Sequence, residues 1–69
     1  MRLRLKEIRE DRHMTQIELA ERLGVSQSFI VRVERGTKAL PLLMAYEISQ
    51  ILGCTIDEIV KGINTHSPL

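Results

Sequence analysis

The sequence predicts an all-α protein, a small bundle of five short helices. Apolar residues along the 69-residue chain recur at helical spacing, and no segment has the spacing of a strand. Only Phe29 and Tyr46 are aromatic, so the core must be aliphatic, which suits packed helices. Capping residues and glycines divide the chain into short helical segments. Sixty-nine residues make one small domain at most.

The first helix is predicted over about residues 3–12. Leu5 and Ile8 are three residues apart and therefore lie on one face, while charged residues fill most of the rest. Arg9 lies on the inner side, beside Ile8, where it could reach a carboxylate. Met14 follows the helix and is expected to fill a gap in the core.

The second and third helices are predicted to form a pair joined by a tight turn. Thr15 and Glu18 have the spacing of a capping box, and Gly24 ends the second helix. The apolar residues expected on its inner side are Ile17, Leu19, Ala20 and Leu23. Ser26 can cap a third helix that Gly36 closes. Two capped helices joined in this way form a helix-turn-helix, whose second helix is shaped to enter the major groove of DNA.

The outward face of the third helix is polar and basic. At about 100° per residue, Ile30 and Val33 define the inward direction. The residues expected on the outward face are Ser28, Val31, Arg32 and Arg35, with Gln27 on the flank at the N-terminal end. Arg can pair with guanine and Gln with adenine in the major groove. A solvated helix face can have the same composition, but the capped turn before this helix favours DNA binding.

The fourth helix is predicted to have Pro41 at its first position and to end at Gly53. Its expected apolar face consists of Leu42, Ala45, Ser49 and Leu52, widened by Ile48 and Ile51. Thr55 and Glu58 repeat the capping-box spacing and begin a fifth helix, which Gly62 ends. We expect residues 1–62 to form the domain and residues 63–69 to be a frayed or partner-dependent C-terminal tail.

Charge is unevenly distributed along the chain. Residues 1–38 contain nine Lys and Arg against six Asp and Glu, a net charge of +3. Residues 39–69 contain one basic and three acidic residues, a net charge of −2. The half that contains the helix-turn-helix is therefore the positive half, as expected for a surface that meets phosphate.

Other classes of function have little support in the sequence. Cys54 is the only cysteine, which excludes an intramolecular disulfide and favours a reducing compartment. No apolar run approaches the ~18 residues of a membrane span, so we expect a cytoplasmic protein without membrane contact. His13 and His66 lack further ligands at metal-site spacing. Asp57 and Glu58 lie at a helix start, where they favour the helix dipole, and form no catalytic pair. We expect no enzyme, metal or cofactor.

The run LKEIREDRHMTQIELAERLGVSQSFIVRVERG, followed by a Pro-initiated helix and LGCTIDEIV, resembles the phage repressor and Cro family of helix-turn-helix proteins. The resemblance covers about residues 3–61 and rests on the order and spacing of TQ-x-ELA-x-x-LGVS and V-E-R-G. It implies a five-helix lambda-repressor-like DNA-binding bundle. It also implies sequence-specific binding to double-stranded DNA and usually a homodimer on a palindromic site. The implied function is a transcriptional regulator, most simply a small repressor or autoregulator.

The resemblance also implies roles for individual residues. The residues expected to contact bases are Gln27, Ser28 and Arg32. Val31 could contact a thymine methyl group or have no partner. The residues expected to bind phosphates are Gln16, Arg35, Thr37 and Lys38. Arg9 and Glu34 match a buried ion pair between the first and third helices, a structural role.

A second hypothesis is a protein-interaction adaptor or antitoxin-like module that binds a partner through the C-terminal helix and tail. The apolar residues available for this are Ile59, Ile63 and Leu69, which could equally form a homodimer interface. The outward Arg32 and Arg35 argue against a pure adaptor, which has no need of them. DNA binding through phosphates would weaken as salt rises, which separates the two hypotheses.

Overall fold

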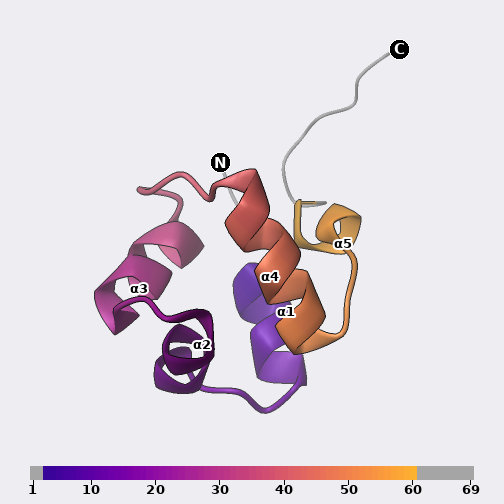
Figure 1. The fold of residues 1–69 in the computed structure, drawn as a ribbon, viewed down its shortest axis with the longest axis horizontal. Helices are drawn as coiled ribbons and strands as arrows, with labels where there is room; N and C mark the ends of the chain where they lie inside the picture. The colour runs from indigo at the N-terminus through magenta and orange to yellow at the C-terminus, as the bar shows by residue number, and fades with distance from the viewer. Residues whose placement is uncertain (1–2, 61–69) are drawn as a thin grey trace.

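The computed structural model describes residues 3–60 and shows an all-helical bundle (Figure 1). Within this range the elements are α1 (Leu5–Asp11), α2 (Gln16–Leu23), α3 (Gln27–Arg35), α4 (Leu42–Leu52) and α5 (Ile56–Val60), with no strand. The all-α prediction is confirmed. The predicted break at Gly62 and the predicted tail, residues 63–69, lie outside the described residues.

Two helix boundaries differ from the prediction. α1 is shorter than predicted, because Arg4 and Arg12 are its capping residues and not part of the helix. Pro41 is the N-cap of α4 and does not occupy its first position. Its ψ of 145° is extended, so the helical conformation begins one residue later, at Leu42.

Side-chain caps set the starts of α2, α3 and α5. Thr15 Oγ1 accepts the N–H of Glu18 at 3.0 Å, and the Thr15 N–H donates to Glu18 Oε1 at 2.8 Å. Thr55 and Glu58 make the same reciprocal pair at 3.0 and 2.9 Å. Ser26 Oγ accepts the N–H of Phe29 at 3.1 Å and so caps α3. Each cap satisfies a backbone donor that the first helical turn leaves without a partner.

Gly24 makes the tight turn between α2 and α3 possible. Its φ of 78° lies in the left-handed region, which a side chain would strain. Its N–H donates to Ala20 O at 2.9 Å, and the next residue, Val25, donates to the same oxygen at 3.0 Å. The chain therefore leaves α2 and enters α3 at Gln27 with only three residues between the two helices.

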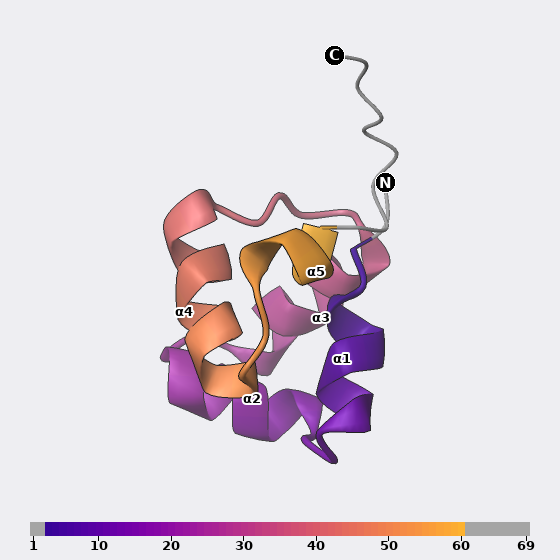
Figure 2. The ribbon, with the colours of Figure 1, turned by 90° about the vertical axis from the view of Figure 1, so that its right-hand side faces the viewer.

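The core is aliphatic and draws on all five helices. The side chains that are almost wholly buried are Leu5, Leu19, Ile30, Val33, Ile48 and Ile59. α2 packs against α3 and α4, while α5 packs against α4 and α1 (Figure 2). The Arg4 N–H donates to Ile59 O at 2.8 Å and ties the start of α1 to α5. α3 lies at one edge of the bundle, so one of its faces is left open (Figure 1).

Two residues predicted on apolar inner faces are exposed in the structure. Ile17 is 52% exposed and Leu42 is 73% exposed. At about 100° per residue, Ile17 lies roughly 110° from the mean direction of the rest of its predicted apolar face. Leu42 is in the first turn of α4, beyond the end of the packed part of that helix. The prediction for Ile17 was wrong because its apolar identity was given more weight than its direction, whereas Leu42 has the predicted direction but lies where no neighbouring helix covers it.

No helix within residues 3–60 has both the length and the hydropathy that crossing a membrane would need.

Candidate nucleic-acid interface

The open face of α3 carries polar and basic side chains. Gln27, Ser28, Arg32 and Arg35 are exposed, whereas Ile30 and Val33 are buried. Val31 is partly buried, so it is less open to solvent than the outward position expected for it. The face presents an amide, a hydroxyl and two guanidinium groups. Groups of these kinds are able to donate or accept hydrogen bonds at base edges and at phosphates.

The N-terminus of α2 lies beside the start of α3. In the capping box, the backbone N–H of Glu18 donates to Thr15 Oγ1. The backbone N–H groups of Gln16 and Ile17, in the same first turn, are not part of the capping box. Such groups, together with the positive end of the helix dipole, favour an anion. Hydrogen bonds from Thr15, first from its backbone and then from its side chain, lower the pKa of Glu18 and keep it ionised.

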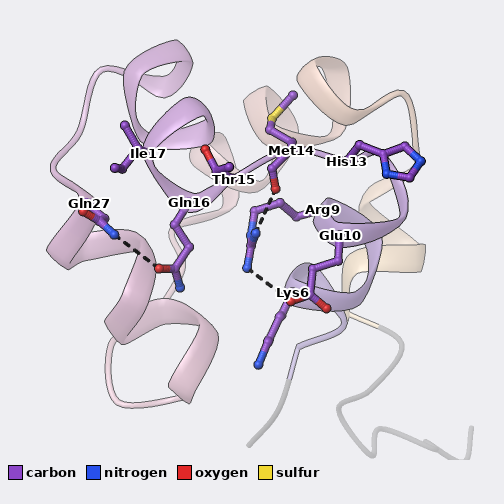
Figure 3. Close-up of a pocket in the computed structure, with 9 residues that line it drawn as sticks. All are labelled: Lys6, Arg9, Glu10, His13, Met14, Thr15, Gln16, Ile17 and Gln27. Carbon is purple, nitrogen blue, oxygen red and sulfur yellow. Dashed lines mark hydrogen bonds and ion pairs between the residues drawn. The ribbon is translucent and has the colours of Figure 1, made fainter.

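Gln16 connects α2 to α3 through both ends of its amide. Its Nε2 donates to Glu34 Oε1 at 3.0 Å. Its Oε1 accepts a hydrogen bond from Gln27 Nε2 at 3.4 Å (Figure 3). The two hydrogen bonds orient Gln27, at the first position of α3, relative to the N-terminus of α2. One N–H of the Gln16 amide remains for a ligand, because an amide nitrogen carries two protons.

Arg9 and Glu34 form a buried ion pair between α1 and α3. Arg9 Nε lies 2.7 Å from Glu34 Oε2 and Arg9 Nη2 lies 3.1 Å from Glu34 Oε1, with side-chain exposures of 7% and 3%. Arg9 Nη1 also donates to Met14 O at 2.8 Å. The hydrogen bonds with Glu34 raise the pKa of Arg9. No buried side-chain nitrogen or oxygen in the described part of the chain lacks a partner.

An open cleft of about 520 Å³ lies between α1 and the N-terminus of α2 (Figure 3). Its lining includes Lys6, His13, Gln16, Ile17 and Gln27. No functional role is predicted for Lys6, His13 or Ile17 from the sequence. For Lys6 there was a signal, because it precedes the inward Arg9 by three residues and so lies on the same side of α1.

The segment after α3 is held by its own hydrogen bonds. The Thr37 N–H donates to Arg32 O at 2.9 Å, and Thr37 Oγ1 donates to the same oxygen at 3.2 Å. The hydroxyl proton of Thr37 is therefore engaged with the end of α3. Arg35 and Lys38, on either side of it in the sequence, are exposed.

The structure offers little for the other candidate sites. Burial raises the pKa of the Cys54 thiol, which favours the less reactive protonated form. Among residues 3–60 no cluster of three or more His, Cys, Asp or Glu could hold a metal ion. Ile59, predicted as part of a partner surface, is wholly buried, so that prediction was wrong for this residue. Ile63 and Leu69 lie outside the described residues.

A capped helix pair with an open polar and basic second helix defines a helix-turn-helix protein. The helix-turn-helix family model, of the Cro/C1 type, matches residues 5–59, and the chain belongs to this family of DNA-binding transcriptional regulators. It is 42% identical over 59 residues to an uncharacterized HTH-type transcriptional regulator of Archaeoglobus fulgidus, covering 86% of this chain and 83% of that protein. A second such regulator, from Methanothermobacter thermautotrophicus, is 40% identical over 53 residues, covering 77% of each chain.

Among solved structures, the chain is similar to one in a complex of the SinR and SinI proteins. The TM-score is 0.75 at 23% sequence identity, and the match covers 94% of this chain. This chain spans 64% of the length of that one. The likeness confirms the predicted lambda-repressor-like fold.

Proposed function

We propose that this protein is a sequence-specific regulator that represses transcription, or its own synthesis, by occupying a palindromic operator as a homodimer. The observation that carries the proposal is the open face of α3. Gln27, Ser28 and Arg32 are exposed on it, while Ile30 and Val33 anchor its opposite side in the core. A rigid helix with hydrogen-bonding groups on its free side is suited to the major groove.

Phosphate contacts set the register of this helix on DNA. The N-terminus of α2 offers the free N–H of the Gln16 side chain together with backbone amides of the first turn, which suits one phosphate. Arg35 and Lys38 lie at and beyond the far end of α3 and reach the backbone on that side. Thr37, whose hydroxyl donates to Arg32 O, holds the loop that carries Lys38.

Base contacts supply the sequence preference. The hydrogen bond from Gln27 Nε2 to Gln16 Oε1 uses one amide proton, which leaves Gln27 Oε1 and the second proton for the edge of an adenine. Arg32 can pair with guanine in the same groove, and Ser28 can accept or donate. Val31, partly buried, is suited only to a close apolar contact such as a thymine methyl.

A dimer follows from the small number of base contacts that one helix can make. Each mismatched base pair costs about 1–3 kcal/mol, whereas a genome offers about 10⁶–10⁹ competing sites. Two recognition helices about 34 Å apart, related by a two-fold axis, would bind in successive major grooves. They would double the free energy by which the protein prefers its operator to other sequences. Occupying promoter DNA would then be enough for repression.

Selection of bound sequences from a random duplex pool tests the proposal. We expect an enriched palindrome, and an affinity for it that falls steeply between low and high salt. For substitutions of the arginines on the α3 face, Arg22→Ala is the matched control. Arg22 is an exposed arginine of α2 that is not part of that face. A pool that returns no consensus, with binding unaffected by salt, would favour the alternative of a protein-interaction module.

A further inference from the structure

Ile17 is an exposed apolar side chain within the helix-turn-helix. It is 52% exposed and occupies the second position of α2. It belongs neither to the core cluster nor to the partly buried hydrophobic residues that pack against that cluster. Among residues 3–60, the other exposed large hydrophobic residues all lie on α4, so Ile17 is the only one on α2 and α3. A β-branched residue also has a lower helix propensity than alanine or glutamate, so neither packing nor propensity accounts for an isoleucine here.

The position of Ile17 makes its exposure informative, since a single exposed isoleucine is ordinary on a protein surface. Ile17 lines the cleft between α1 and α2 together with Gln16 and Gln27, two of the residues proposed to contact DNA. In Figure 3, Ile17 and Gln27 lie at the same side of this cleft, away from His13. The hydrogen bond between Gln16 and Gln27 keeps the proposed phosphate and base contacts adjacent. A duplex that contacts both glutamines would therefore also lie against Ile17.

The chemistry of an isoleucine side chain limits what it can recognise on a duplex. It has no hydrogen-bonding group, so it gains only by removing apolar surface from water. The apolar group that the base pairs present in the major groove is the C5-methyl group of thymine. A β-branched side chain has one strongly preferred χ1 in a helix, so Ile17 loses little freedom when it makes such a contact. Ile17 is exposed whereas Val31 is partly buried, so Ile17 has the larger apolar surface to cover.

The arrangement of the two helices indicates which base pair Ile17 would contact. Gln27 is the first residue of α3, and its amide is held towards α2 by Gln16 Oε1. Ile17 follows Gln16 in the chain and lies on the α2 side of Gln27 (Figure 3). Gln27 occupies the edge of its own base pair, so Ile17 is left with the neighbouring base pair on the α2 side.

We infer that Ile17 is a specificity-determining residue, which contacts the methyl group of a thymine in the base pair next to the one that Gln27 contacts. The inference rests on the function proposed above and extends it. It adds a base contact from α2 to a set of base contacts that otherwise come from α3. It also explains why an apolar side chain lies in a cleft whose other DNA-facing residues are polar.

Exchange of thymine for deoxyuridine in the selected operator tests the inference, because deoxyuridine lacks only the C5-methyl group and still pairs with adenine. We expect selection from the random duplex pool to return a thymine next to the position whose base preference Gln27→Ala relaxes. Deoxyuridine at this thymine in one half-site should weaken wild-type binding about fourfold, as expected for the loss of one buried methyl group.

Two variants assign the contact to Ile17. Ile17→Ala should bind the thymine and deoxyuridine duplexes equally, and it should melt as the wild type does because Ile17 lies outside the core cluster. The matched control is Leu43→Ala, which shortens another exposed aliphatic side chain, 73% exposed on α4. This control should keep the fourfold preference for thymine. Loss of the preference in Ile17→Ala alone is the result that supports the inference.

The other outcomes overturn the inference and separate it from the proposed function. If Ile17→Ala keeps the wild-type preference for thymine over deoxyuridine, the methyl contact belongs to another residue, such as Val31. If the wild type binds both duplexes equally while Ile17→Ala binds both more weakly, Ile17 contacts the deoxyribose of the backbone and specifies no base. A consensus without such a thymine also overturns the inference but leaves the proposed function intact. A pool that returns no consensus overturns the proposed function itself.

Discussion

Replacing Arg9 by alanine should destabilise the protein more than any exposed substitution. Arg9 Nε and Nη2 donate to the two oxygens of Glu34, and Arg9 Nη1 donates to Met14 O. Without them, the Glu34 carboxylate keeps its hydrogen bond from Gln16 but loses the only positive charge paired with it in the described residues. Since the side chain of Glu34 is only 3% exposed, water cannot fully replace that charge.

The size of the effect follows from this burial. Removing one partner of a buried ion pair costs about 3–5 kcal/mol, because a charge is left uncompensated. A domain of 69 residues has a total free energy of unfolding of about 3–10 kcal/mol. In a domain this small, each kcal/mol lowers the melting temperature by about 4–8 °C. Arg9→Ala should therefore lower the melting temperature by at least about 12 °C.

The assay is urea and thermal unfolding followed by circular dichroism. Arg22→Ala is the matched control, because Arg22 is exposed, and its effect should stay within about 0.5 kcal/mol. The double variant Arg9→Met/Glu34→Leu removes both charges at once, so it should be more stable than Arg9→Ala by at least about 1 kcal/mol. An Arg9→Ala melting temperature equal to that of the wild type would refute the reasoning. A double variant as unstable as the sum of its two single changes would also refute it.

Three further predictions concern recognition and pH. Arg32→Ala should relax base preference at one position of each half-site, measured by repeating the selection from random duplexes; an equal loss on every sequence would assign Arg32 to the backbone. Gln16→Ala should weaken binding to all duplexes alike, and a changed consensus would contradict the phosphate contact. The capping hydrogen bonds of Thr15 lower the pKa of Glu18 in the folded state. Their stabilisation is therefore complete above the ordinary Glu pKa of about 4.3 and is lost as the pH falls through the lowered value. In urea unfolding, the difference between the wild type and Glu18→Gln should shrink as the pH falls from 6 to 2, and a constant difference would exclude this contribution.

The sequence was sufficient to predict the helices because their limits are set by local chemistry. Thr15, Ser26 and Thr55 each accept a backbone N–H three residues later, which is a pattern that spacing alone predicts. Gly24 and Gly36 end their helices in the left-handed conformation, as glycines at these positions commonly do. The outward direction of Ser28, Arg32 and Arg35 followed from the helical period once the apolar anchors of α3 were recognised.

What the sequence could not predict depends on contacts between distant segments. Arg12 Nε donates to Leu52 O at 2.9 Å, forty residues along the chain, and so satisfies a carbonyl at the end of α4. No local pattern identifies that partner. The exposure of Leu42 likewise depends on how far α5 and the loop after α3 extend over the start of α4. The 520 Å³ cleft beside the start of α2 depends on how α1 is placed against that helix.

The position of Glu34 links the stability of the fold to the residues proposed for DNA recognition. Its Oε2 accepts from Arg9, while its Oε1 accepts from both Arg9 and Gln16. Gln16 in turn accepts from Gln27, so one chain of hydrogen bonds runs from the buried side of α1 to the first residue of α3. Because these bonds cross between three helices, a shift of α3 along its own axis would break several of them together. The ion pair therefore fixes the distance between the proposed phosphate contact on α2 and the proposed base contact on α3. A protein that binds duplex DNA at both phosphates and bases needs this distance to be constant, because the phosphates and the base edges of the duplex are a fixed distance apart.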